Sequence, residues 1–135
     1  MSRSKLVVTG ATGTIATRIL PDLAERYDLI LLDVKSTDRQ GNTIEGVIEA
    51  DLLSRDRDGY RHHFEGADAV LHCAFIQDGD FDYYDPDRFW MENDNVRMAY
   101  NIFQVCQEAD VRRVVMMSSN HAADYYESLI LHGKL

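Results

Sequence analysis

The segment Thr9–Ala16, with the sequence TGATGTIA, places two glycines directly between an apolar run and an amphipathic stretch. The apolar run KLVVT at Lys5–Thr9 is typical of a parallel strand that is buried on both faces. Gly10 permits a tight turn, Gly13 lets the backbone approach a diphosphate, and Ala16 allows the next helix to pack closely on the sheet. Free backbone N–H groups at the start of that helix would hold phosphate oxygens. Without this placement, the glycines would indicate only an ordinary turn.

Short apolar runs alternate with longer amphipathic stretches along the rest of the chain. The later strands are expected at Asp28–Val34, Gly46–Ala50, Ala67–Ala74 and Arg113–Ser118, and the helices at Thr14–Arg26, Asp56–Phe64 and about Pro86–Ala109. The apolar spacing predicts that one face of the first helix carries Ile15, Ile19 and Leu23, and that the last helix packs through Val96, Ala99, Phe103 and Cys106. Pro21 is expected to kink the first helix. The polar stretches Lys35–Thr43 and Gln77–Asp87 are expected to be surface loops, and no further strand is expected after the fifth.

This alternation predicts parallel strands joined by crossover helices. The expected fold is an α/β Rossmann-type domain over residues 1–135, with a doubly wound parallel sheet in the order 3-2-1-4-5. The chain, at 135 residues, is long enough for one hydrophobic core and too short for two domains. Ligands bind such sheets beyond the carboxyl ends of the strands where the winding reverses, which is between the first and fourth strands here.

The charge and cysteine content exclude several classes of protein. Fourteen Lys plus Arg stand against 23 Asp plus Glu, a formal net charge of −9. A field of this sign repels the phosphates of nucleic acids and anionic membranes, so neither is expected as a partner. The two cysteines lie in hydrophobic stretches, which indicates reduced thiols and not a disulfide framework. These features and the absence of a signal peptide or a long apolar span predict a cytoplasmic location.

Two acidic residues follow strands on the same side as the glycine motif. Asp33 ends the second strand 20 residues after the second glycine, where its carboxylate can accept hydrogen bonds from both hydroxyls of an adenosine ribose. Its charge would repel the extra phosphate of NADP, so NAD is favoured, although Lys35 and Arg39 would weaken that preference. Asp51 and Leu52 follow the third strand, where they would meet the adenine ring. The alternative role for Asp51 is to cap a helix or turn.

Six segments together resemble the extended short-chain dehydrogenase/reductase family, the NAD-dependent epimerases and dehydratases, and the resemblance covers nearly the whole chain. The segments are TGATGTIA, the strand-terminal Asp33, Asp51-Leu52, HCAF at His72–Phe75, NVRMAYN at Asn95–Asn101 and MSSNHAADYY at Met117–Tyr126. Within that family, SSNH directly after the fifth strand is similar to the uronate dehydrogenases and the NAD-dependent glucose-6-phosphate dehydrogenases. The resemblance implies NAD as cofactor, a small sugar as substrate, and a homodimer when the chain is full length.

The resemblance also implies a role for individual residues. Those that would face NAD are Gly10, Gly13, Thr14, Ile15, Asp33, Asp51, Leu52, Ala74, Asn95 and Ser118. Ser119 would be the catalytic serine, which hydrogen-bonds the substrate oxygen at the carbon that exchanges hydride with nicotinamide. Asn120 and His121 would bind sugar oxygens, and Gln77 would assist them.

Alternatives remain open for some of these residues, and two others depart from the family pattern. His121 could instead brace its loop, and Asn95 could simply tie its helix to a neighbouring loop. Met98 stands where many relatives have glycine, and Phe75 would be bulky beside the cofactor. Phe89, Trp90 and Phe103 are interpreted as core residues, or as part of a helix pair through which extended family members dimerise.

The family's chemistry requires a tyrosine as base and a lysine four residues later that lowers the tyrosine pKa. Neither Tyr125 nor Tyr126 has a lysine at that spacing, since Lys134 is eight residues after Tyr126 and follows Gly133. The expectation is therefore an N-terminal fragment that lacks the catalytic helix and the substrate domain and is inactive by itself.

The activity that the resemblance implies is oxidation of the C1 hydroxyl of a sugar or sugar derivative, a uronate or a hexose phosphate, to a lactone, with hydride passed to NAD. Two alternatives remain: a nucleotide-sugar epimerase or dehydratase with tightly bound NAD, and a non-catalytic NAD-binding module. No metal site is expected, because the histidines and cysteines fit no zinc spacing and the acidic stretch at Asp78–Asp87 lacks the EF-hand pattern.

Overall fold

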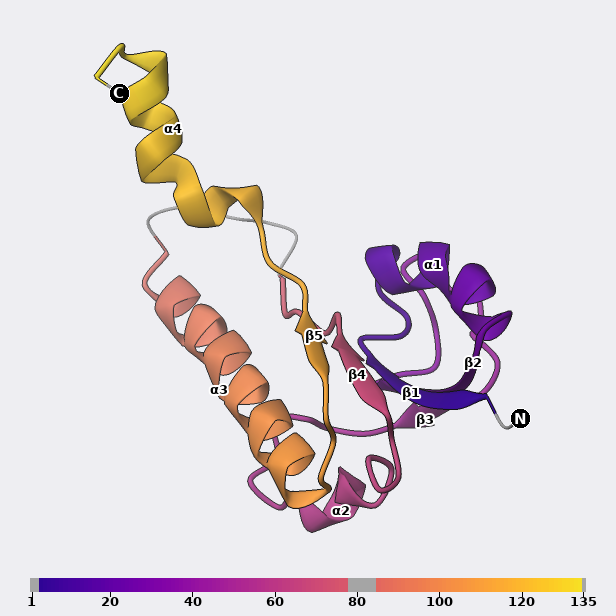
Figure 1. Ribbon diagram of the computed structural model, residues 1–135. Helices are drawn as coiled ribbons and strands as arrows, with labels where there is room; N and C mark the ends of the chain where they lie inside the picture. The colour runs from indigo at the N-terminus through magenta and orange to yellow at the C-terminus, as the bar shows by residue number, and fades with distance from the viewer. Residues whose placement is uncertain (1–2, 78–84, 135) are drawn as a thin grey trace.

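The computed structural model describes residues 3–77 and 85–134, and of Asn120 and His121 it describes only the backbone. Its centre is a five-stranded parallel sheet with the order β3-β2-β1-β4-β5 (Figure 1). The strands are β1 (Ser4–Thr9), β2 (Tyr27–Asp33), β3 (Val47–Glu49), β4 (Ala69–His72) and β5 (Val114–Met116). The predicted fold class and strand order are confirmed.

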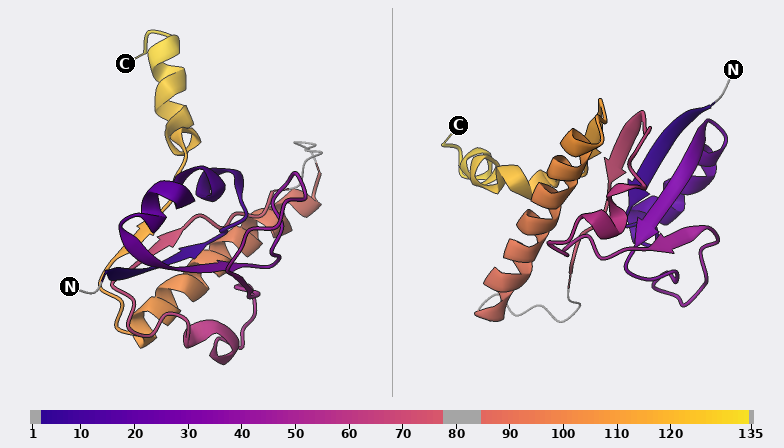
Figure 2. Two further views of the ribbon diagram at one scale, coloured as in Figure 1. Left: turned by 90° about the vertical axis from the view of Figure 1, so that its right-hand side faces the viewer. Right: turned by 90° about the horizontal axis from the view of Figure 1, so that it is seen from below.

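Helices connect the strands and cover both faces of the sheet (Figure 2). They are α1 (Thr14–Ala24), α2 (Asp58–Arg61), α3 (Asp87–Glu108) and α4 (Asp124–Leu131), the last preceded by a 3-10 turn at Asn120–Ala123. Helix α4 extends away from the sheet and has no buried residue (Figure 1). None of the described helices is long and apolar enough to cross a membrane.

Two hydrophobic clusters pack against the two faces because side chains alternate along each strand. Leu6 and Val8 of β1 pack with Ala16 and Leu20 of α1 on one face. Val7, which points the opposite way, belongs to the cluster formed with α2 and α3. The sheet is therefore buried on both sides, as expected for parallel strands.

The second predicted helix is shorter than expected. Asp56–Phe64 was the expected range, but α2 contains only Asp58–Arg61. Beyond it, the backbone N–H groups of His63, Phe64 and Ala67 each donate to the carbonyl three residues earlier. This tighter turning ends the α-helix and directs Phe64 into the core, where it is fully buried.

The packed faces of two helices differ from those predicted. On α1 the buried residues are Ala16 and Leu20, whereas Ile15 is half exposed near the glycine turn. On α3 the buried apolar residues are Met98, Ile102, Val105 and Cys106, so only Cys106 of the predicted stripe is buried.

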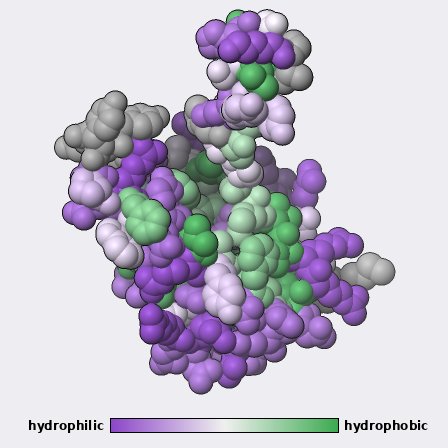
Figure 3. Space-filling view, turned by 90° about the vertical axis from the view of Figure 1, so that its left-hand side faces the viewer, coloured by the Kyte–Doolittle hydropathy of each residue, from purple (hydrophilic) through white to green (hydrophobic). Residues whose placement is uncertain are grey.

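The aromatic residues of α3 do not belong to the core, so of the two interpretations offered for Phe89, Trp90 and Phe103 the core interpretation is wrong. Val96 and Phe103 are 67% and 49% exposed, and Phe89 and Trp90 are 64% and 65% exposed. Figure 3 shows the side of the molecule on which α3 lies, and green apolar residues stand there among purple polar ones. The reason is that α3 has apolar residues on more than one face, and the sheet can bury only one of them.

Candidate functional site at the carboxyl ends of the strands

The turn after β1 is pressed against the end of β4. Gly10 has φ +68°, and a Cβ built on it would lie 2.5 Å from the Cα and N atoms of Ala74. Backbone hydrogen bonds hold the turn from both sides, from Ala11 N to Leu32 O (3.2 Å) and from Cys73 N to Thr9 O (3.1 Å). Only glycine fits this close approach, so the two strands that border the predicted cleft meet at Gly10.

The start of α1 faces the same edge of the sheet. Gly13 is the N-cap residue, no side chain caps the helix with a hydrogen bond, and its first turn contains no acidic residue. The first backbone N–H groups of a helix lack intrahelical acceptors and carry the positive end of the helix dipole. This helix start is therefore suited to hold an anionic group, as the glycine motif predicts.

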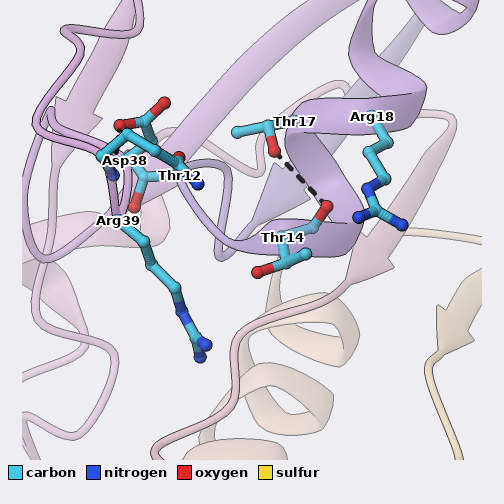
Figure 4. A pocket seen from close by; sticks show the side chains of 7 residues that line it. Thr12, Thr14, Thr17, Arg18, Asp38 and Arg39 are labelled. Carbon is cyan, nitrogen blue, oxygen red and sulfur yellow. Dashed lines mark hydrogen bonds between the residues drawn. The ribbon is translucent and has the colours of Figure 1, made fainter.

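A pocket of about 90 Å³ lies beside this helix start (Figure 4). It is lined by Thr12, Thr14, Thr17, Arg18, Asp38, Arg39 and Gln40. Arg18 comes from α1 and Arg39 from the loop after β2, so two cationic side chains flank the uncapped helix. Sequence reasoning identified Thr14 and Arg39 here and missed the others. Asp38 and Gln40 were missed because the folded position of the polar loop after β2 has no signal in its sequence.

Asp33 connects the end of β2 to the glycine turn. Its Oδ2 accepts hydrogen bonds from the backbone N and the hydroxyl of Thr12, at 2.9 and 2.8 Å. Its Oδ1 accepts one from Val34 N at 2.7 Å. These bonds orient the carboxylate at the strand end, where the sequence predicts a site for an adenosine ribose. Oδ1 keeps further capacity to accept a hydroxyl, since each carboxylate oxygen has about two acceptor sites.

Asp51 and Leu52 form a tight turn after β3. The Asp51 Oδ1 accepts a hydrogen bond from Leu53 N at 2.9 Å, so its side chain does cap a turn. Leu52 as a whole residue is 3% exposed and its side chain packs in the core, so a ligand could contact this residue only at its backbone. The Asp51 side chain is exposed.

Two asparagines of α3 bind the backbone of two different loops. Asn95 donates from Nδ2 to Ile76 O (3.0 Å) and accepts at Oδ1 from Ile76 N (2.7 Å). This is the loop tie that the sequence left open as an alternative, and it fixes the chain after β4. Asn101 donates from Nδ2 to Leu52 O (2.8 Å) and Ser54 O (3.2 Å). Sequence reasoning missed Asn101, although its polar side chain falls on the buried face of α3.

His72 at the end of β4 is buried against β1. Its Nδ1 and the Thr9 hydroxyl are 2.6 Å apart, and both residues are at most 5% exposed. Burial lowers the pKa of His72 to about 4, so the imidazole is neutral at neutral pH. His72 therefore braces the two central strands beside the cleft. Within the described residues, no group of three or more His, Cys, Asp or Glu side chains could hold a metal ion.

The segment after β5 lies beside the end of β4, because Met117 N donates to His72 O at 3.2 Å. Ser118 and Ser119 follow directly and are exposed. The side chains of Asn120 and His121 lie outside the described residues. Gln77 is exposed at the last described position of the loop after β4. Asp33 ends β2, and Gly10, Ala74 and the two serines follow β1, β4 and β5, so these residues lie at the carboxyl ends of four adjacent strands at one edge of the sheet.

The two departures from the family pattern are accommodated differently. Met98 is 6% exposed and packs in the core on the α3 side. Phe75 is 63% exposed in the loop after β4. The extra volume of Met98 is therefore taken up by core packing.

Known proteins resemble the chain in sequence and in structure. L-arabinose 1-dehydrogenase (NAD(P)(+)) of Haloferax volcanii is 30% identical over 125 residues, which are 91% of this chain and 44% of that protein. Uronate dehydrogenase from Agrobacterium tumefaciens has a TM-score of 0.67 at 26% identity, covering 90% of this chain and 42% of that one. A point mutant of that enzyme complexed with NAD also gives 0.67, at 25% identity over 89% of this chain and 42% of that one.

The chain therefore spans less than half the length of these relatives. The profile of the NAD dependent epimerase/dehydratase family matches residues 6–129, which is most of the chain. Together with the strand order and the glycine turn, this match shows that the chain belongs to the NAD dependent epimerase/dehydratase family.

Proposed function

We propose that this chain is the NAD-binding part of a dehydrogenase that oxidises the C1 hydroxyl of a sugar or sugar derivative, such as a uronate or hexose phosphate, to a lactone. The observation that carries the proposal is the junction at Gly10, where a turn that admits no Cβ leads into an uncapped helix start. The diphosphate of NAD fits this helix start, and Asp33 would accept hydrogen bonds from the adenosine ribose. Thr14, Ile15, Ala74, Asn95 and Ser118 would line the same cleft.

NAD, when bound, supplies the acceptor for the hydride that leaves C1 of the sugar. Ser119 would donate a hydrogen bond to the oxygen on that carbon, and Asn120, His121 and Gln77 would bind other sugar oxygens. The proton of the C1 hydroxyl must pass to a base as the carbonyl forms. No tyrosine of this chain has the lysine four residues later that would lower its pKa, so the base would come from residues beyond Leu135.

The test measures NADH absorbance after the protein is mixed with NAD and a panel of sugars. The protein used is this chain together with any coding sequence that follows Leu135. The panel contains aldoses, uronic acids and hexose 6-phosphates. Turnover of one class supports the proposal, and Ser119→Ala should lower kcat by about 100-fold or more, as for other groups that assist proton transfer. Saturating NAD binding without NADH formation from any sugar would contradict the proposed reaction.

A second candidate is a nucleotide-sugar epimerase or dehydratase, which the family membership favours. Such an enzyme regenerates its bound NAD, so product would form from a nucleotide sugar without net NADH. Product analysis by chromatography separates the two activities. A homodimer and a cytoplasmic location complete the proposal, and the oligomer is tested by light scattering.

A further inference from the structure

The turn after β3 is anchored from three separate elements. Ala50 N donates to Asp33 O at 2.8 Å, which ties the start of the turn to β2. The Tyr60 hydroxyl of α2 donates to Ser54 O at 3.3 Å. The third anchor is Asn101 of α3, whose single Nδ2 group donates to Ser54 O and also to Leu52 O.

Asn101 lies where an apolar residue would be expected. It is 7% exposed and sits between the buried positions Met98, Ile102 and Val105 of α3. Burying an amide costs free energy unless its hydrogen bonds are made, and a leucine of similar size would fill the same space without that cost. The specific contribution of Asn101 is therefore the fixed position of two carbonyl groups, and not apolar packing.

The anchored turn presents a donor and an acceptor side by side. Leu53 N donates a hydrogen bond to Asp51 Oδ1, and the Leu52 side chain packs in the core. Among the residues that the structure describes, the Asp51 Oδ2 and the Leu52 N–H make no hydrogen bond. An acceptor next to a donor is complementary to the N6 amino group and N1 of adenine, which offer a donor next to an acceptor.

We propose that Asn101 is the positioning residue for recognition of the adenine base, although it does not touch the base itself. This inference rests on the proposed binding of NAD. By its hydrogen bonds to the carbonyls of Leu52 and Ser54, Asn101 fixes the position and orientation of the turn relative to α3. It thereby fixes the donor and the acceptor that would hydrogen-bond to the edge of the adenine base. Asn101 thus sets selectivity for adenine over a base with the opposite hydrogen-bond pattern.

The test compares the dissociation constants of NAD and of nicotinamide hypoxanthine dinucleotide by calorimetry on the full chain. Hypoxanthine has an oxygen in place of the N6 amino group and carries a proton on N1, so it reverses both groups. The unaltered protein is expected to prefer NAD by about 10-fold or more, because two mismatched hydrogen bonds would be left. Asn101→Leu is expected to reduce this preference to about 3-fold or less.

Three further variants separate positioning from general structure. Gln107→Leu also replaces an amide side chain by leucine, at an exposed site of α3, and should leave both dissociation constants unchanged. Asn95→Leu removes the tie to the other loop, so it should weaken binding of both dinucleotides by the same factor. Tyr60→Phe keeps the ring and loses only the bond to Ser54 O, and it should lower the preference by a smaller factor, about 2-fold to 3-fold.

The outcomes distinguish this inference from the proposed function. If the unaltered protein binds neither dinucleotide, the proposed function fails and the inference fails with it. If the protein prefers NAD and Asn101→Leu keeps that preference, the inference alone is wrong. If the unaltered protein binds both dinucleotides equally, the turn does not read the base and the inference is again wrong. Should Asn101→Leu fail to fold, Asn101→Ser takes its place, and an unchanged preference in that variant overturns the inference.

Discussion

Substituting Gly10 by alanine tests the close contact on which the cleft depends. The new Cβ would lie 2.5 Å from two backbone atoms of Ala74 and 2.7 Å from the carbonyl carbon of Cys73. Backbone atoms cannot move aside as a flexible side chain can, so the turn and the end of β4 would have to separate. Such overpacking costs about 1–3 kcal/mol. The positive φ of residue 10 adds about 1–2 kcal/mol for any residue with a Cβ.

Gly66 provides a matched control for the backbone conformation. Its φ is +70°, close to the +68° of Gly10, but a Cβ there would meet no atom within 4 Å. Gly66→Ala therefore measures the conformational cost alone. The difference between the two variants isolates the steric cost at Ala74.

Urea unfolding monitored by circular dichroism gives both free energies of unfolding. Gly10→Ala is expected to lose about 2–5 kcal/mol in total, which shifts the midpoint by about 1 M urea or more. Gly66→Ala is expected to lose only about 1–2 kcal/mol. Equal losses in the two variants would refute the argument, because the contact with Ala74 would then cost nothing.

Three other predictions concern single side chains. Asp33→Asn should weaken NAD binding about 10-fold and improve the affinity for NADP relative to NAD, measured by calorimetry with both cofactors; an unchanged ratio would argue against a ribose site at Asp33. The neutral form of His72 is favoured in the folded state, since its pKa falls from 6.5 to about 4. The free energy of unfolding should have its full value above pH 6.5. It should decline by roughly 3 kcal/mol as the pH falls to 4, because over this range the unfolded chain takes up a proton at His72 that the folded chain does not. Urea unfolding across that range should show a smaller decline for His72→Gln, and identical profiles would contradict the assignment. Burial raises the pKa of Cys106 to about 11, so a disulfide reagent at pH 8 should modify it only after unfolding, and rapid labelling of Cys106 in folded Cys73→Ser would contradict its burial.

The sheet could be predicted from the sequence because the apolar runs are short and regularly separated. Parallel strands buried on both faces read as continuous apolar segments, and the right-handed crossover rule then leaves one winding order. The structure has this order. The predicted strand ends differ from the observed ones by only one or two residues. These residues are the hardest to place, because the ends of a strand depend on local hydrogen bonds.

The packed face of α3 could not be predicted from spacing alone. Val96, Tyr100 and Phe103 form one apolar row and Met98, Ile102 and Val105 another, and both rows have helical spacing. The structure buries the second row, and the sheet register decides this through contacts that are distant in sequence. A polar residue in a row is normally evidence of exposure, so Asn101 made the buried row harder to recognise.

The sequence could place the candidate site residues at one edge of the sheet, but it could not predict the hydrogen bonds among them. Residues that follow a strand could be placed at one edge because strand ends have a sequence signal. The bond from Thr12 to Asp33, and that from Asn101 to Leu52, join residues 21 and 49 positions apart. Such pairings depend on how the loops lie after folding, which no local pattern of the sequence specifies.

The most direct test of a dinucleotide site at this edge of the sheet is a titration of the nitrogen-15 labelled chain with NAD, followed by nuclear magnetic resonance. The backbone amides from Gly10 to Thr14, those at the end of β2 and the Leu52 amide should shift together and saturate with one dissociation constant. The exposed face of α3 should remain unchanged. Shifts confined to α3 or α4, or no saturable change at any amide, would contradict the proposal that NAD lies across the ends of these strands.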